Sequence, residues 1–174
     1  MQDNYGIDQY VRSIPDFPEE GIMFRDVTSV LQDADGLQLA IQGVEALLKD
    51  LEFDAVVGPE SRGFIFGVPV AYNLKKSFIP VRKKGKLPCE TIEKTYDLEY
   101  GTATIEMHKD AIQPGMKVVI VDDLMATGGT AKAIVEMVEE MGAEVAAMLF
   151  LIELDFLEGR KVLPGYKIES VLHY

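Results

Sequence analysis

The sequence predicts an α/β fold, with a central and mostly parallel sheet flanked by helices. Short apolar runs alternate with amphipathic stretches along the chain, and a strand–helix–strand alternation requires crossover connections between parallel strands. The run at 117–121 is rich in Val and Ile without polar alternation, which is typical of a strand covered on both faces. With 174 residues, 48% of them apolar, the chain is expected to form one domain over residues 1–174.

Each element of this fold has its own signal. Residues 1–34 contain Pro15, Pro18 and Gly21, which predicts an irregular flap, or hood, over one end of the sheet. Apolar residues at helical spacing predict a helix over 35–51, with Asp35 as its N-cap. The other core elements are expected in the order strand 54–58, helix 63–74, strand 78–81, strand 117–121, helix 130–141 closed by Gly142, and strand 145–151.

Residues 82–110 interrupt this rhythm, because they are polar and rich in turn formers. The stretches 96–100 and 102–108 are expected to pair as a hairpin that turns near Gly101. An insertion of this length between core elements is more often functional than structural. The segment 82–110 is therefore interpreted as a connector followed by a mobile catalytic loop, or lid.

The charge balance limits the classes of partner. Lys and Arg number 17 and Asp and Glu number 29, which gives a net charge of −12 and disfavours binding to nucleic acid. Four basic residues nevertheless fall within five positions: Arg82, Lys83, Lys84 and Lys86. This cluster suits a small anionic ligand better than a long polyanion, although a solvated turn around Gly85 would give the same pattern.

The location expected from the sequence is the cytoplasm, with no membrane partner. The longest apolar run, 145–152, is far shorter than the roughly 20 residues that cross a bilayer. The start of the chain has neither a basic region nor an apolar stretch. A lone Cys89 fits a reducing compartment, and we assign it no function.

The chemistry is concentrated at 118–130, where a buried strand runs into Asp122 and Asp123. A loop of small residues and the start of a helix follow, and free backbone N–H groups at such a helix start bind phosphate. Open parallel sheets bind ligands at this edge. The predicted phosphate cradle consists of Ala126, Thr127, Gly128, Gly129 and Thr130.

The acid pair limits the kinds of ligand that this site can bind. Two carboxylates would repel a phosphate unless they face something else, such as ribose hydroxyls or a magnesium ion held by them. The combination suggests a ribose 5-phosphate. The patterns GxxxxGK[ST] and GxGxxG of other nucleotide loops are absent, and the alternative for 118–130 is a glycine-rich structural turn.

This segment resembles the phosphoribosyl pyrophosphate signature of the type I phosphoribosyltransferases. The resemblance extends over nearly the whole chain, and it is greatest to the family members that use adenine. Four further segments carry it: 17–26 resembles the flap, 58–64 the pyrophosphate loop, 82–88 the connector and 98–101 the mobile catalytic loop. Two departures are Glu60, where many relatives have Asp, and Cys89, where some have glycine.

The resemblance implies a role for each motif. Asp122 and Asp123 would hold the ribose hydroxyls, and 126–130 would hold the 5-phosphate. Ser61 and Arg62, after a cis peptide at Glu60–Ser61, would bind pyrophosphate. The full set of implied site residues is completed by Arg82 and Lys86 for pyrophosphate, Glu99 for proton transfer, Tyr100 for loop closure, Phe24 and Leu154 on the two faces of adenine, and the backbone of Met23 and Arg25 at its edge.

The resemblance also implies the reaction, in which adenine and phosphoribosyl pyrophosphate give AMP and pyrophosphate in purine salvage. Mg²⁺ would be held mainly by the substrate rather than by protein ligands, and His108 and His173 are too isolated to suggest a metal pair. A homodimer is expected, with Arg82 extending toward the partner's site. The alternatives are an enzyme for xanthine, hypoxanthine or guanine, or a non-catalytic sensor of phosphoribosyl pyrophosphate.

Overall fold

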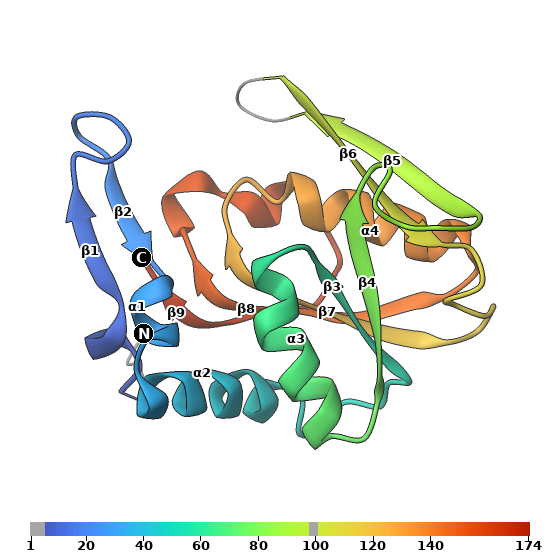
Figure 1. Ribbon diagram of the computed structural model, residues 1–174, viewed down its shortest axis with the longest axis horizontal. Helices are drawn as coiled ribbons and strands as arrows, with labels where there is room; N and C mark the ends of the chain where they lie inside the picture. Colours follow the sequence, from blue (N-terminus) through green and yellow to red (C-terminus); the bar gives the residue numbers. More distant parts are fainter. Residues whose placement is uncertain (1–5, 98–100) are drawn as a thin grey trace.

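A mixed seven-stranded sheet in the order β5-β6-β4-β3-β7-β8-β9 forms the centre of the molecule (Figure 1). The structure is a computed structural model, and it describes residues 6–97 and 101–174. Five neighbouring strands of this order, β4, β3, β7, β8 and β9, are parallel to one another. Strand β6 is antiparallel to β4, and β5 is antiparallel to β6. The predicted, mostly parallel sheet is therefore confirmed. The strands are β3 (Ala55–Pro59), β4 (Ser77–Lys83), β5 (Thr91–Asp97), β6 (Thr102–His108), β7 (Lys117–Met125), β8 (Glu144–Glu153) and β9 (Ile168–His173).

Helices cover both faces of this sheet. Helices α2 (Ala34–Leu47) and α3 (Arg62–Asn73) lie on one face, and α4 (Gly129–Glu140) lies on the other (Figure 1). Strand β7 shows why its sequence lacks polar alternation: Val119 belongs to the core beside α2 and α3, and Ile120 belongs to the core beside α4. The short helical segments are η1 (Asp8–Tyr10), α1 (Thr28–Leu31), η2 (Asp155–Leu157) and η3 (Gly159–Val162). No helix in 6–97 or 101–174 is long and apolar enough to cross a membrane.

Several predicted element ends differ from the structure: α2, for example, ends at Leu47 and not at residue 51. Two of the differences have clear local reasons. The N-cap of α2 is Asp33 rather than Asp35, because Asp33 has extended backbone and its carboxylate accepts hydrogen bonds from the N–H groups of Asp35 and Gly36, both at 2.9 Å. Strand β7 continues to Met125, because its pairing with β8 extends as far as Met125 opposite Glu153. The acid pair therefore lies within the strand rather than after it.

The flap is more regular than the sequence indicated. Strands β1 (Arg12–Pro15) and β2 (Met23–Asp26) pair as an antiparallel hairpin, so an irregular flap was a wrong prediction. Of the turn formers that suggested irregularity, Pro15 ends β1, whereas Pro18 and Gly21 lie in the loop between the strands, where Gly21 has φ +87°. Figure 1 shows this hairpin beside the end of the chain at β9.

The predicted lid hairpin is present, with one end displaced. Its second strand, β6, has the expected bounds, but β5 runs over Thr91–Asp97 instead of beginning at Tyr96. Pairing from Thr91 opposite His108 to Asp97 opposite Thr102 uses the whole length of both strands. An ion pair of 3.0 Å between Lys94 Nζ and Glu140 Oε2 also holds β5 against α4. These contacts make β5 longer than its polar sequence suggested.

Candidate active site

The carboxyl ends of β3, β4 and β7 surround a cavity of about 500 Å³. This is the edge at which open parallel sheets bind ligands. The loop after β3, the start of α4 and the lid hairpin contribute its other walls. The lining residues are Pro59, Glu60, Ser61, Arg62, Val81, Lys83, Tyr96, Ala103, Ile105, Asp122, Asp123, Leu124 and Thr130.

The acid pair lies on the cavity wall formed by β7. Asp123 is only 4% exposed, and its N–H donates to Oδ1 of Asp122 at 2.8 Å. Burial, followed by the charge of neighbouring Asp123, raises the pKa of Asp122 well above its usual range. Gly63 makes this close packing possible, because a Cβ there would lie 3.0 Å from Asp122 Oδ1 and 2.7 Å from Pro59 Cδ.

The predicted pyrophosphate loop faces this acid pair across the cavity. The expected cis peptide at Glu60–Ser61 is confirmed, and Arg62 follows as the first residue of α3. The Nε atom of Arg62 lies 2.7 Å from Oδ2 of Asp123. This contact is an ion pair without hydrogen-bond geometry, so the buried Oδ2 accepts no hydrogen bond within the described part of the chain.

The predicted phosphate cradle consists of the loop after β7 and the first two residues of α4. A smaller hollow of about 80 Å³ is lined by all five residues of 126–130 and by Asp122. Gly128 has φ +81°, a conformation that glycine adopts without strain, and α4 starts at the next residue. The free N–H groups at the start of α4 therefore face the hollow that adjoins the acid pair.

The outer wall of the phosphate loop is Gly159 of η3, which was not predicted from the sequence. A Cβ on Gly128 would lie 2.6 Å from the carbonyl oxygen of Gly159, and a Cβ on Gly159 would lie 2.3 Å from that of Ala126. The two glycines therefore bring η3 into backbone contact with the loop. The only sequence signal is Gly159 itself, which has no recognisable motif around it.

The basic cluster contributes a different residue from the two that were predicted. Lys83 lines the cavity, whereas Arg82 and Lys86 do not. Alternate residues of a strand point to opposite sides, so Lys83 shares the cavity side of β4 with Val81. Arg82 instead pairs with Glu60, with Nε 2.5 Å from Oε2. Pyrophosphate binding by Arg82 and Lys86 stays a prediction.

The backbone of Lys86 has a clear structural role. Its N–H and that of Leu87 donate to Oε1 of the buried Glu106, at 2.8 and 2.7 Å. Burial alone would raise the pKa of Glu106, but the N–H groups of Leu87, Gly85 and Lys86 outweigh it and lower the pKa. Glu106 thus fixes the connector turn to the base of the lid.

A second residue missed at the sequence level, Tyr96, joins the lid to the phosphate loop. The hydroxyl of Thr130 donates to the hydroxyl of Tyr96 at 3.0 Å. Tyr96 also lines the large cavity. Its position three residues before Glu99 was the signal that could have identified it. Glu99 and Tyr100 themselves lie outside the described residues, so their roles stay predictions.

The predicted adenine-binding residues lie on the flap and at the end of β8, outside the lining of the large cavity. The guanidinium carbon of Arg25 lies 3.9 Å from the ring centre of Tyr174, whose N–H donates to the carbonyl of Glu153 at 2.9 Å. Through Tyr174, Arg25 on the flap is linked to the end of β8, where Leu154 follows Glu153. Met23 and Phe24 are on the same strand as Arg25, and the Phe24 ring packs edge to face against Phe17, with centroids 5.2 Å apart.

Comparisons with known proteins agree with this geometry. The phosphoribosyl transferase domain family matches residues 31–165. An adenine phosphoribosyltransferase of Lachnoclostridium phytofermentans is 67% identical over 168 residues, which cover 97% of this chain and 97% of that protein. The expected relationship to the family members that use adenine is supported by this identity.

Solved structures give the same result. The crystal structure of adenine phosphoribosyltransferase from Thermoanaerobacter pseudethanolicus has a TM-score of 0.92 and 50% identity, covering 97% of this chain and 98% of that one. The enzyme from Saccharomyces cerevisiae, solved with an imino-altritol bisphosphate and adenine, has a TM-score of 0.88 and 40% identity, covering 95% and 96%. The chain therefore belongs to the adenine phosphoribosyltransferases of the type I phosphoribosyltransferase family.

Proposed function

We propose that the cavity at the carboxyl ends of β3 and β7 is where the chain performs the reaction of its family. In that reaction the 5-phosphoribosyl group passes from phosphoribosyl pyrophosphate to adenine, which gives AMP and pyrophosphate. One observation carries the assignment: the acid pair on β7, the phosphate loop after it and the Arg62 turn after β3 meet around adjoining hollows. Asp122 lines both hollows, so the acid pair lies between the other two parts, as ribose lies between the 5-phosphate and pyrophosphate in the substrate.

The charges of these residues suit displacement at the anomeric carbon. The sugar becomes cationic in the transition state, and Asp122 and Asp123 stabilise it from the ribose side. The leaving pyrophosphate accumulates negative charge, which the Arg62 guanidinium neutralises. Because Arg62 contacts Asp123, pyrophosphate would take the place of Asp123 as its partner, and the carboxylate would turn to a ribose hydroxyl.

The donor set also suits a magnesium ion carried by the substrate. The buried Oδ2 of Asp123 accepts no hydrogen bond within 6–97 and 101–174, which leaves it available to a ribose hydroxyl or to a water on the ion. Asp122 and Asp123 would hold the ion only through the substrate. When bound, magnesium neutralises the charge of pyrophosphate as it departs.

The remaining roles rest on the family resemblance. Glu99 would accept the proton that adenine loses, and the lid of 82–110, closed with the help of Tyr100, would exclude water. The flap of 1–34 would supply Met23, Phe24 and Arg25 to one side of adenine, with Leu154 on the other. The contact between Arg25 and Tyr174, which bonds to the end of β8, supports this arrangement.

Pyrophosphate release tests the proposal directly. Purified protein with Mg²⁺ and phosphoribosyl pyrophosphate should release pyrophosphate quickly with adenine and far more slowly with hypoxanthine, guanine or xanthine. The variant Asp122→Asn/Asp123→Asn should lose the activity while it keeps its fold by circular dichroism. Full activity in this variant would place the reaction elsewhere on the molecule.

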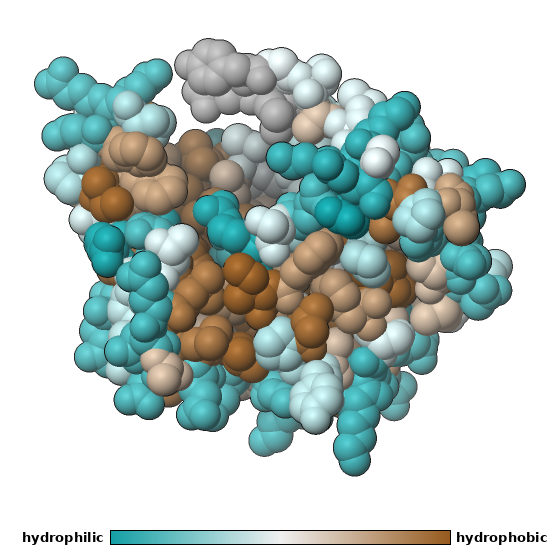
Figure 2. All heavy atoms as spheres, in the orientation of Figure 1, coloured by the Kyte–Doolittle hydropathy of each residue, from teal (hydrophilic) through white to brown (hydrophobic). Residues whose placement is uncertain are grey.

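The family also leads us to expect a homodimer. Helix α3 offers a surface for it, because Ile65, Val68 and Tyr72 are 38%, 46% and 81% exposed and share one helix face. Figure 2 shows apolar atoms gathered on this face of the molecule. Sedimentation velocity should give a dimer that Val68→Glu converts to a monomer, and a wild-type monomer would refute both the dimer and a role for Arg82 at a partner's site.

The cytoplasm stays our proposed location. Cys89 is a free and exposed thiol, which suits a reducing compartment. Fractionation of the source cells with an antibody to the protein would test this location, and recovery outside the cytoplasmic fraction would contradict it.

A further inference from the structure

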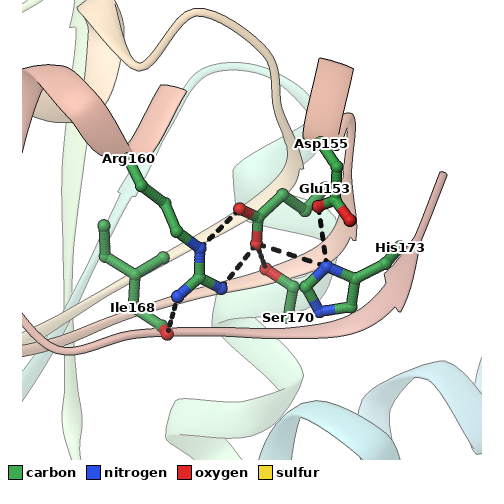
Figure 3. Close-up of polar contacts among 6 residues, drawn as sticks. All are labelled: Glu153, Asp155, Arg160, Ile168, Ser170 and His173. Carbon is green, nitrogen blue, oxygen red and sulfur yellow. Dashed lines mark hydrogen bonds and ion pairs between the residues drawn. The ribbon is translucent and has the colours of Figure 1, made fainter. Parts of the chain in front are cut away.

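A buried acid lies just outside the proposed site, at the end of β8. Glu153 is 4% exposed, and both of its carboxylate oxygens bind Arg160: Nε is 2.6 Å from Oε1, and Nη2 is 2.7 Å from Oε2 (Figure 3). Ser170 on β9 donates to Oε2 at 2.6 Å. Burial alone would raise the pKa of Glu153, but Arg160 and Ser170 outweigh it and lower the pKa. The carboxylate is thus held ionised.

Arg160 uses its third nitrogen to complete a bridge. Its Nη1 donates to the carbonyl of Ile168 on β9 at 3.0 Å, so the guanidinium joins η3 to two strands of the sheet (Figure 3). A planar guanidinium that makes a bidentate pair and a backbone contact has little freedom to rotate. One side chain therefore ties η3 to both β8 and β9.

The residue before Arg160 is the outer wall of the phosphate loop. A Cβ on Gly159 would lie 2.3 Å from the Ala126 carbonyl oxygen and 3.2 Å from the Gly128 nitrogen. A shift of η3 by a fraction of an ångström would therefore move the loop or leave a gap behind it. Because phosphate is bound by several backbone N–H groups at once, their alignment depends on this wall.

A metal site is a poorer explanation of the same cluster. Ligand atoms of Glu153, Asp155 and His173 lie within 4.8 Å of one another. However, both oxygens of Glu153 already accept from Arg160, and a guanidinium at this distance would repel a divalent cation. His173 Nδ1 also has a partner, Asp155 Oδ1 at 2.9 Å (Figure 3).

We propose that Arg160, held by Glu153, is a positioning residue for the 5-phosphate of the ribosyl substrate. It sets the place of Gly159, and Gly159 sets the conformation of the phosphate loop. The inference rests on the proposed function only in taking 126–130 as the 5-phosphate site. It assigns no contact between Arg160 and the substrate.

The test measures the two anionic subsites separately by calorimetric titration. Arg160→Gln should raise the dissociation constant of ribose 5-phosphate about tenfold, because the loop N–H groups lose alignment. The dissociation constant of pyrophosphate with Mg²⁺ should change by less than about twofold, because Arg62 lies on another element. Gly159→Ala, which disturbs the same contact without touching Glu153, should show the same split. Lys161→Gln is the matched control on η3, since Lys161 is 71% exposed and its ammonium pairs with Glu158 of the same segment.

The outcomes separate this inference from the proposed function. An unchanged ribose 5-phosphate affinity in Arg160→Gln, or an equal loss for both ligands, would overturn the positioning role. If Arg160→Gln does not fold, Gly159→Ala decides by the same criterion. Thr127→Val, within the loop, should also weaken ribose 5-phosphate. If that variant binds normally while wild type binds, the assignment of 126–130 is at fault rather than the role of Arg160.

Discussion

Arg62 and Asp123 form an ion pair across the cavity, with Nε 2.7 Å from Oδ2. The residue assigned to pyrophosphate and a residue assigned to ribose thus neutralise each other. With the proposed roles, substrate binding at this site would be an exchange of partners rather than the filling of two empty positions. An exchange conserves the count of charged contacts, so specificity comes from geometry more than from net attraction.

Replacing Arg62 should weaken binding of the pyrophosphate half of the substrate and leave binding of the nucleotide half unchanged. Arg62→Ala is expected to raise the dissociation constant of pyrophosphate about a hundredfold, which corresponds to a lost charged contact of roughly 2–3 kcal/mol. AMP affinity should stay within about twofold, because AMP carries no pyrophosphate. Calorimetric titration with each ligand measures both values. An equal loss for AMP would show that Arg62 shapes the whole cavity instead.

Glu99 should matter for turnover rather than for binding. Glu99→Gln keeps the size of the side chain but cannot accept the proton that adenine loses, so kcat should fall about 10²- to 10⁴-fold. The dissociation constant of phosphoribosyl pyrophosphate should be unchanged. Rapid-quench kinetics and a binding titration on one preparation give the two numbers. A parallel loss of both would contradict proton transfer by Glu99.

The hydroxyl of Tyr96 should help to anchor the lid hairpin. In Tyr96→Phe the Thr130 hydroxyl loses its partner, so the free energy of unfolding should fall by about 1 kcal/mol. Amide hydrogens of β5 should also exchange faster with solvent, which mass spectrometry can locate. Asp50→Asn serves as the control, because Asp50 is exposed and belongs to neither the lid hairpin nor α3. Equal exchange rates in both variants would mean that the pairing of β5 with β6 suffices.

The sequence was sufficient for the features that depend on neighbouring residues. Apolar runs with covered faces identified the parallel strands, and the stretch from Asp122 to Thr130 identified a strand, a loop of small residues and a helix start that line one hollow. Prediction from the sequence failed for elements whose structure depends on contacts between residues far apart in the chain. Strand β9 was not predicted, because Ile168–His173 mixes polar and apolar residues and is fixed by pairing with β8. The helical spacing of 35–51 could not show which of Asp33 and Asp35 caps α2, since both precede the same apolar stripe.

The site shows the same division. Gly159 contacts the phosphate loop from more than 30 residues away along the chain, and Glu153 and Arg160 find each other only when η3 folds back on the sheet. Lys83 and Arg82 are adjacent in one basic cluster, so only the direction in which β4 points them shows which one reaches the cavity. The sequence shows which chemical groups are present, but only the fold shows which of them reach the cavity.

The carboxylate of Asp122, which the proposed function needs, should lower the stability of the folded chain at neutral pH. Its pKa is raised by burial and by the Asp123 charge, so the folded chain holds this proton to a higher pH than the unfolded chain, whose Asp pKa is about 3.9. At this group the native state binds more protons in this range, so the contribution of Asp122 to stability must fall as pH rises above about 4. Asp122→Asn removes the titration, and it should raise the free energy of unfolding at neutral pH by about 1–2 kcal/mol.

The pH profile distinguishes this effect from general repacking. Urea unfolding of wild type and Asp122→Asn should give equal stability below about pH 4, where the wild-type carboxyl is protonated in both states, and a growing difference above it. Asp50→Asn, at an exposed position, should follow wild type throughout. Asp122→Asn should at the same time lose affinity for ribose 5-phosphate, because an amide replaces a carboxylate that accepts from the ribose hydroxyls. A variant with a constant stability gain at every pH would show that charge is not the cause, and one that gained stability and kept full affinity would remove Asp122 from the ribose site.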